Sequence, residues 1–187
     1  MDSTEGQIDW SVCDAPAHVE DRWIVSRLNV LARDLDRFLD EYQIGEAQKA
    51  LYEFIWSEFC DWYLELAKVR VRSGEGPSPL PYLADILEKT LRLLHPFMPF
   101  VTEQIWQHLN IAMERHARPA SGESIMLAEY PTTNLDLIDA DAEEDITTLM
   151  DVVRSIRNVR AEMRIEPTVK MTASIHSDEA SEFLAGE

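Results

Sequence analysis

Cysteines and long apolar runs are scarce in this sequence of 187 residues. No stretch comes near the roughly 18 consecutive apolar residues that a membrane-spanning helix needs. The N-terminus, Met1-Asp2-Ser3-Thr4-Glu5, has neither the basic start nor the apolar stretch of a secretory signal. Two thiols, Cys13 and Cys60, do not indicate a disulfide-stapled secreted fold. We therefore expect a cytoplasmic protein with reduced cysteines and no membrane contact.

Positive charge is also scarce, because the sequence has 17 Lys and Arg but 35 Asp and Glu, which gives a formal net charge of −18. Phosphate contacts are normally made by a basic surface, so the total argues against unspecific nucleic-acid binding. The distribution matters more than the sum, since residues 1–21 and 136–151 contain no Lys or Arg. The basic residues gather at 22–37, 68–72 and 154–164. Local basic stripes can still hold RNA, so charge alone leaves nucleic-acid binding open.

No catalytic or metal centre can be assembled from the residue types present. The five histidines show no metal-ligand spacing with one another or with the two cysteines. The run Gly74-Glu75-Gly76 lacks the lysine and the further glycine of a phosphate loop. The acidic run from Asp139 has Glu144 at the sixth position, where a calcium loop needs glycine. We expect no catalytic residue, no metal site and no cofactor in this chain.

An apolar repeat at three- and four-residue spacing is the strongest pattern that the sequence does contain. It predicts a central helix at 45–72, in which Phe54 to Tyr63 contribute five aromatic rings to one core. The same spacing predicts further helices at 21–41, 81–94, 99–111 and 140–164. Two prolines in His95-Pro96-Phe97-Met98-Pro99 predict a sharp corner before the helix at 99–111. That helix is expected to bury Val101, Ile105, Trp106 and Leu109.

Three segments follow from these elements. Residues 1–20 form an acidic, irregular lead-in, and 21–136 form a helical bundle. Residues 137–187 hold the long helix and a strand at 168–176, where Val169, Met171, Ala173 and Ile175 alternate with polar residues. A further helix beginning near Asp178 is cut off at Glu187, so we expect the chain to be part of a longer protein. The predicted fold class is mainly α, with the start of a small α/β appendage at the C-terminal end.

Five motifs in order resemble class Ia aminoacyl-tRNA synthetases. Asp21-Arg22-Trp23-Ile24-Val25-Ser26-Arg27-Leu28-Asn29 resembles the first-helix signature of the valine, isoleucine and leucine enzymes. The corner from Leu93 to Trp106 is similar to their shared corner motif. Residues 50–68, 123–131 and 156–167 resemble the valyl-tRNA synthetases in particular. The resemblance covers about Asp21 to Ile175, most of the chain.

This resemblance implies an anticodon-binding helical domain that positions valine tRNA for ATP-dependent aminoacylation. The family's ATP-site signatures, His-Ile-Gly-His and Lys-Met-Ser-Lys-Ser, do not occur here. The catalytic fold that uses ATP and Mg, and the editing domain, are expected upstream, and a coiled-coil arm downstream. The chain alone should be inactive and monomeric. An alternative of another class is an acidic helical module that binds a protein partner through an exposed apolar groove.

The resemblance also nominates residues for RNA contact. Arg22 and Trp23 match the part of the family pattern associated with the anticodon loop, where a ring can stack on an unpaired base. Alternatively, Trp23 only closes the end of the bundle. Arg27 flanks the core and can instead pair with an acid on the second helix. A stripe on the last helix is expected to meet the tRNA backbone, or else only to suit the helix dipole: Arg154, Arg157, Arg160 and Arg164.

Overall fold

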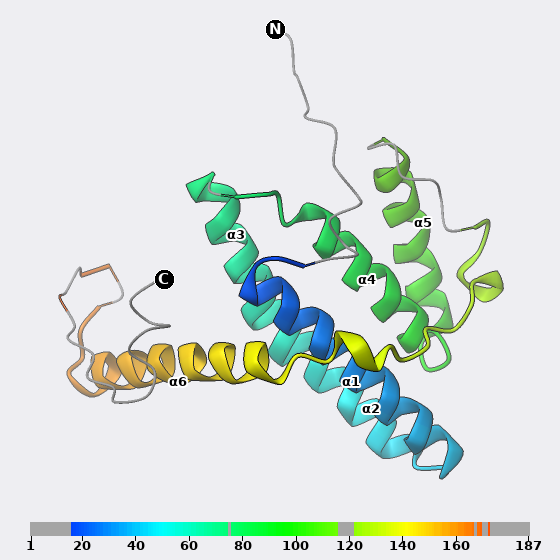
Figure 1. The fold of residues 1–187 in the computed structure, drawn as a ribbon, viewed down its shortest axis with the longest axis horizontal. Coiled ribbons are helices and arrows are strands. Elements are labelled where there is room, and N and C mark those ends of the chain that lie inside the picture. The colour runs from blue at the N-terminus through cyan, green and yellow to red at the C-terminus, as the bar shows by residue number, and fades with distance from the viewer. Residues whose placement is uncertain (1–15, 75, 116–121, 167, 170–171, 173–187) are drawn as a thin grey trace, which may run out of the picture. The chain divides into compact units, whose positions relative to one another are not determined.

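The computed structural model describes residues 16–74, 76–115, 122–166, 168–169 and 172. The chain divides into two compact units, Met1–Asp139 and Ala140–Glu187, which are described separately below (Figure 1). Within the described residues, none of the helices combines the length and the apolarity that crossing a lipid bilayer demands.

The first unit is a bundle in which the first helix packs against the helices that follow it. Helix α1 (Val19–Asp40) contacts both the second helical rod and α4 (Leu80–Leu94), and α4 in turn contacts α5 (Pro99–Arg115) (Figure 1). The second rod is continuous and comprises α2 (Ile44–Glu53), the π-helical segment η2 (Phe54–Tyr63) and α3 (Leu64–Ser73). Two short 3₁₀ turns, η3 (Ile125–Leu127) and η4 (Leu135–Leu137), lie in the connection after α5. The predicted mainly helical fold is confirmed.

The centre of the second rod winds as a π-helix over ten residues, which the sequence pattern did not predict. Its buried side chains are Phe54, Phe59 and Tyr63, and the rings of Phe59 and Tyr63 lie 6.1 Å apart, centroid to centroid. Their five- and four-residue spacing suits the wider turn of a π-helix, which hydrogen-bonds from i to i+5. The rod ends at Gly74, whose φ of 69° supplies the left-handed cap that most other residues resist.

A buried ion-pair network ties the start of α1 to the end of the second rod. Asp21 is fully buried, and its Oδ1 accepts hydrogen bonds from Tyr63 Oη at 2.7 Å and from Arg70 Nη2 at 2.8 Å. Arg70 Nη1 also donates to Glu20 at 2.7 Å. Burial, together with the charge of Asp21, raises the pKa of the Tyr63 hydroxyl. The network therefore fixes one end of the bundle through charge as well as through packing.

The exposed and buried faces of α5 differ from those that the sequence predicted. Trp106 is fully buried as expected, but Val101 is 48% exposed and Ile105 is 40% exposed, so the prediction for these two residues was wrong. The buried face instead carries two polar residues, Thr102 and Asn110. The Thr102 hydroxyl lies 2.7 Å from His95 Nδ1 and 2.9 Å from the Met98 carbonyl oxygen. These bonds satisfy a buried polar group and set the rotation of the helix, which apolar periodicity cannot reveal.

The second unit begins with α6 (Ala140–Glu162), which agrees with the helix predicted at 140–164. Acidic residues occupy its first turn and Arg160 its last, as suits a helix dipole. The strand predicted at 168–176 lies largely outside the described residues and stays a prediction. Of the lead-in at 1–20 only residues 16–20 are described, and α1 already begins at Val19.

Candidate nucleic-acid interface

Arg22 lies in the first turn of α1, where it meets the end of the connection from α5. Its Nε is 3.6 Å from Asp139 Oδ2, and its side chain is half-buried. The backbone N–H of Asp139 donates to Ser26 Oγ at 2.9 Å, so Asp139 is anchored on α1 independently of this ion pair. Arg22 therefore holds a defined position, although its side chain keeps 39% of its surface exposed.

Trp23 does not present a stacking surface in this conformation. Only 3% of the residue is exposed, so a nucleotide base has no access to the face of the indole ring. The alternative role that the sequence allowed, closing the end of the bundle, describes this position better. Adjacent residues on a helix point about 100° apart, which explains how Arg22 reaches solvent while Trp23 does not.

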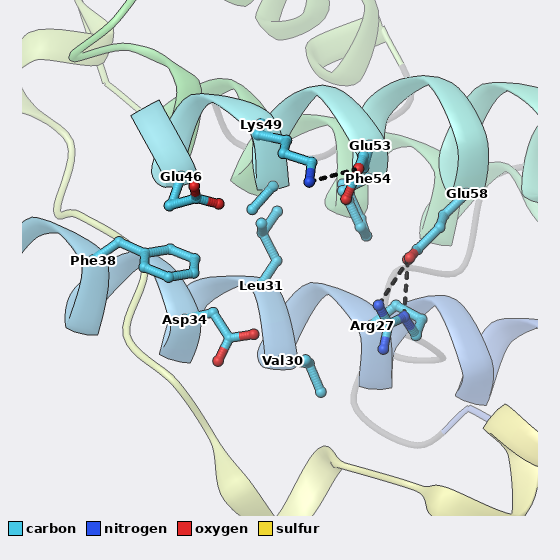
Figure 2. A pocket seen from close by; sticks show the side chains of 11 residues that line it. Arg27, Val30, Leu31, Asp34, Phe38, Glu46, Lys49, Glu53, Phe54 and Glu58 are labelled. Carbon is cyan, nitrogen blue, oxygen red and sulfur yellow. Dashed lines mark hydrogen bonds and ion pairs between the residues drawn. The ribbon is translucent and has the colours of Figure 1, made fainter. Parts of the chain in front are cut away.

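Arg27 pairs with an acid on the second rod, which is the alternative that the sequence left open. Its Nε and Nη2 donate to the two carboxylate oxygens of Glu58 at 2.9 and 2.8 Å (Figure 2). A two-point arginine–carboxylate contact is among the stronger side-chain interactions and holds the guanidinium plane in a fixed orientation. Arg27 thus joins α1 to η2.

The same pair closes one end of a hollow between α1 and the second rod. This hollow has a volume of about 230 Å³. Figure 2 shows apolar and charged side chains lining it from both α1 and the second rod, with Lys49 Nζ 3.9 Å from Glu53 Oε1. Four carboxylates face two cations: Asp34, Glu46, Glu53 and Glu58 against Arg27 and Lys49. An RNA phosphate would meet an excess of negative charge here, so the hollow is no phosphate-binding site.

The turn between α1 and α2 offers what Trp23 does not, an exposed aromatic ring. Tyr42 is 89% exposed, and its φ of 58° turns it out of the helix. On the last turns of α1, the Cζ of Arg37 lies 4.4 Å from the centroid of the Phe38 ring. The side chains of Arg33 and Arg37 are exposed, and each also pairs with Asp34 Oδ1, at 3.2 and 4.0 Å. Stacking on aromatic rings and guanidinium planes is how proteins hold unpaired bases. Sequence reasoning missed this turn, although an aromatic residue directly after a helix end could have drawn attention to it.

The four arginines of the second unit have different environments. Arg154 Nη1 is 3.0 Å from Asp151 Oδ1 on the exposed surface of α6. Arg160 Nη2 donates to the carbonyl oxygens of Glu166 and Val169 at 2.6 and 3.0 Å, so it fastens the segment that follows the helix. Arg157 and Arg164 are exposed. The predicted stripe therefore contains one arginine that holds backbone carbonyls and three that lie at the surface.

Residues 21–175 match a family model described as the anticodon-binding domain of tRNA ligase. The chain is 43% identical over 171 residues to the valine–tRNA ligase of Dehalococcoides mccartyi strain CBDB1, covering 91% of this chain and 19% of that protein. It is 45% identical over 166 residues to the Bacillus cereus ATCC 10987 valine–tRNA ligase, covering 87% and 18%. For the Nostoc sp. PCC 7120 valine–tRNA ligase the identity is 40% over 179 residues, covering 92% and 17%. The chain thus spans about a fifth of the length of these curated relatives.

Proposed function

The chain belongs to the family of anticodon-binding domains of tRNA ligases, and from that premise we propose that it grips the anticodon limb of valine tRNA within a valine–tRNA ligase. The observation that carries this proposal is the match of nearly the whole chain to valine–tRNA ligases from three different bacterial genera. In such a ligase the activation of valine with ATP and Mg, its transfer and the editing of misactivated threonine belong to other domains. The role of this chain is to bind the anticodon limb of the tRNA.

Within each unit taken by itself, the geometry supports tRNA contacts that differ in part from those nominated by sequence. We assign unpaired bases to the exposed Tyr42 ring and to the Arg37–Phe38 pair, where stacking does not depend on net charge. No phosphate is assigned to this segment, because Asp34, Asp36, Asp40 and Glu41 lie in it. Arg22, Arg154, Arg157 and Arg164 are assigned to tRNA phosphates. Trp23, Arg27 and Arg160 are assigned no tRNA contact, because Trp23 is buried, Arg27 pairs with Glu58, and Arg160 donates to two backbone carbonyl oxygens.

The affinity of the chain for tRNA should be low and sensitive to salt. Its net charge of −18 repels phosphates at long range, and only the local arginines oppose that repulsion. In a complete ligase, contacts elsewhere on the tRNA would raise the effective concentration of the anticodon loop, an advantage of about 10²–10⁴-fold. Specific recognition by this surface is therefore compatible with an acidic protein.

A gel-shift comparison of valine tRNA with an unrelated tRNA, at low and at moderate salt, tests the proposal. We expect tighter binding of valine tRNA at both salt concentrations. Tyr42→Ala should weaken that binding by about ten- to a hundredfold, the cost of a lost base stack of roughly 1–3 kcal/mol. Tyr52→Ala is the matched control, because Tyr52 is another exposed tyrosine but lies on α2 and not in the turn. Equal binding of both tRNAs at both salt concentrations would contradict the proposal.

A further inference from the structure

Asp139, the acid beside the candidate tRNA contact Arg22, is not explained by the function proposed above. We propose that Asp139 competes with RNA phosphates for the Arg22 guanidinium and so lowers the affinity of the chain for any RNA backbone. The inference deepens the proposed function and rests on it, because it takes Arg22 as a phosphate contact. Its consequence is that tight binding depends more on contacts to bases, which can distinguish one tRNA from another.

The contact between the two side chains is close but incomplete. Arg22 Nε lies 3.6 Å from Asp139 Oδ2, which is within ion-pair distance but too long for a hydrogen bond. Among the residues that the structure describes, this Nε–H finds no hydrogen-bond acceptor, and it is also shielded from water. The pair is thus held by charge, so a phosphate can replace the carboxylate without first breaking a hydrogen bond. A phosphate that accepts two parallel hydrogen bonds from an arginine makes the stronger contact.

Asp139 is held in place by bonds that do not involve Arg22. Its backbone N–H donates to Ser26 Oγ at 2.9 Å, and Ser26 is fully buried on α1. Earlier in the same connection, the backbone N–H of Asn134 donates to Asn29 Oδ1 at 2.9 Å. These two bonds hold the connection against α1 without the ion pair. The carboxylate therefore stays beside Arg22 when a phosphate approaches, and the two like charges repel.

A carboxylate fixed beside an arginine weakens phosphate binding in two ways. The attraction within the ion pair is given up at least in part, and the phosphate is placed close to another negative charge. The two side chains keep 39% and 29% of their surface exposed, so solvent and salt screen both effects. An exposed pair of this kind corresponds to about a two- to fivefold change in affinity. Unlike the long-range repulsion from the net charge of −18, this effect is confined to one phosphate.

Arg154, another arginine assigned to phosphates, is paired differently. Its partner Asp151 lies three residues away on the same helix, at 3.0 Å, and both side chains are more than half exposed. Such an exposed pair within one helix contributes little to binding or stability. Asp139, in contrast, reaches Arg22 from a distant part of the chain and is anchored on buried Ser26. The acid in this pair is therefore positioned by the fold of the bundle.

A double-mutant cycle with Arg22→Ala and Asp139→Asn tests the competition. Asp139→Asn removes the charge and keeps the shape, and Asn serves as well as Asp at the position directly before a helix such as α6. Asp136→Asn is the matched control, because Asp136 is an exposed acid of the same connection and forms no ion pair with any residue that the structure describes. Both Asn variants change the net charge by the same amount, so only the local contact differs. Fluorescence anisotropy at several salt concentrations measures binding of valine tRNA and of an unrelated tRNA to the full chain.

At low salt we expect Asp139→Asn to tighten the binding of both tRNAs about two- to fivefold more than Asp136→Asn does, and by less as the salt concentration rises. In the Arg22→Ala background this difference should disappear, because the cation for which Asp139 competes is gone. Equal effects of the two Asn variants, or a difference that persists without Arg22, would overturn the inference. Weaker binding by Asp139→Asn would also overturn it and would make Asp139 a residue that orients Arg22.

The same titrations separate this inference from the proposed function. If the unaltered chain does not prefer valine tRNA, the proposed function fails, whereas the cycle measured on both tRNAs still decides the role of Asp139. If the chain prefers valine tRNA and the two Asn variants bind alike, only the inference about Asp139 fails. Absence of binding of either tRNA at the lowest salt concentration, by the unaltered chain and by Asp139→Asn, would overturn both. Equal melting temperatures of the two Asn variants confirm that both are folded.

Discussion

Single buried side chains explain how the first helix keeps its place. The carboxylate of Asp21 has no access to water and receives hydrogen bonds from Tyr63 and Arg70. Its neighbour in sequence, Arg22, stands at the surface beside Asp139. A charge that is buried without partners is strongly destabilising, so removal of one partner affects more than a single hydrogen bond.

Arg70→Ala should lower the free energy of unfolding by about 3–5 kcal/mol, because it leaves the Asp21 carboxylate buried beside a tyrosine alone. Combining Arg70→Met, Asp21→Leu and Tyr63→Phe should recover most of that loss, since apolar groups of similar volume often replace a buried ion pair without cost and the Tyr63 hydroxyl would otherwise lose its acceptor. Urea denaturation followed by circular dichroism measures both. A loss below about 1 kcal/mol for Arg70→Ala would show that the network adds little to stability.

Glu103 gives a prediction about pH. Hydrogen bonds from Gln107, and then from Ser124 and the Ile125 backbone, hold the pKa of its carboxyl below the ordinary value of 4.5. A lowered pKa in the folded state adds stability at pH values above 4.5, and that stability is lost as the pH falls through the lower folded-state pKa. Glu103→Gln should therefore make the unfolding free energy less dependent on pH in this acidic range. Parallel curves for the variant and the unaltered protein would speak against this role.

Residue-level chemistry was only partly foreseeable from sequence. The pairing of Arg27 with an acid on the second helix was foreseen as an alternative, because Arg27 flanks the apolar face of its own helix. That the acid is Glu58 became known only from the structure. The burial of Trp23 could not be deduced, since the sequence was compatible both with a ring exposed for base stacking and with a ring packed at the end of the bundle. Tyr42 was missed because exposure depends on the left-handed backbone at the turn, which no periodicity encodes.

At the scale of elements, apolar spacing predicted the helices but not always their rotation. The helices at 45–72 and 81–94 appear where expected because their apolar stripes are long and regular. In α5 the buried face is set by the polar residues Thr102 and Asn110 and their contacts, and not by the apolar stripe alone. The π-helical winding of η2 was not predicted either, because other apolar residues of the segment, such as Ile55 and Trp62, complete a three- and four-residue repeat. Phe54 and Tyr63, nine residues apart, would lie on opposite faces of an α-helix but share the buried face of the wider π-helix.

The corrected rotation of α5 can be checked by a pair of substitutions. Trp106→Ala should cost about 3–5 kcal/mol of unfolding free energy, because it empties a fully buried site. Val101→Ala, on the exposed face of the same helix, should change it by no more than about 0.5 kcal/mol. Chemical denaturation of the two variants under identical conditions measures the difference. Similar losses for both would mean that Val101 is packed in solution.

At the scale of the whole molecule, a substitution on the tRNA-binding surface should reduce tRNA binding without changing the activation of valine. In a complete ligase Arg22→Ala should weaken aminoacylation of valine tRNA while leaving valine-dependent pyrophosphate exchange unchanged, since exchange requires no tRNA and takes place in another domain. Assaying both reactions on the same enzyme preparation makes the comparison internal. A parallel fall in the two activities would indicate that Arg22 acts on the fold and not on the tRNA.

Substitution of an arginine that contacts only phosphate should change the salt dependence of tRNA binding. Arg157→Ala should flatten the dependence of binding on salt, by about one unit of slope at most, without changing which tRNA is preferred. Titrations at several salt concentrations with valine tRNA and an unrelated tRNA provide the slopes. A change in tRNA preference would instead assign Arg157 to a base edge.

If this chain binds the anticodon limb, it should distinguish two halves of one tRNA. The anticodon stem-loop of valine tRNA and a helix copied from its acceptor end have similar backbone charge but different loops, so electrostatics alone would not distinguish them. Fluorescence anisotropy at moderate salt should show binding of the stem-loop, weakened by Tyr42→Ala, and little binding of the acceptor helix. Equal affinity for both halves, or preference for the acceptor helix, would show that the chain does not bind the anticodon limb specifically.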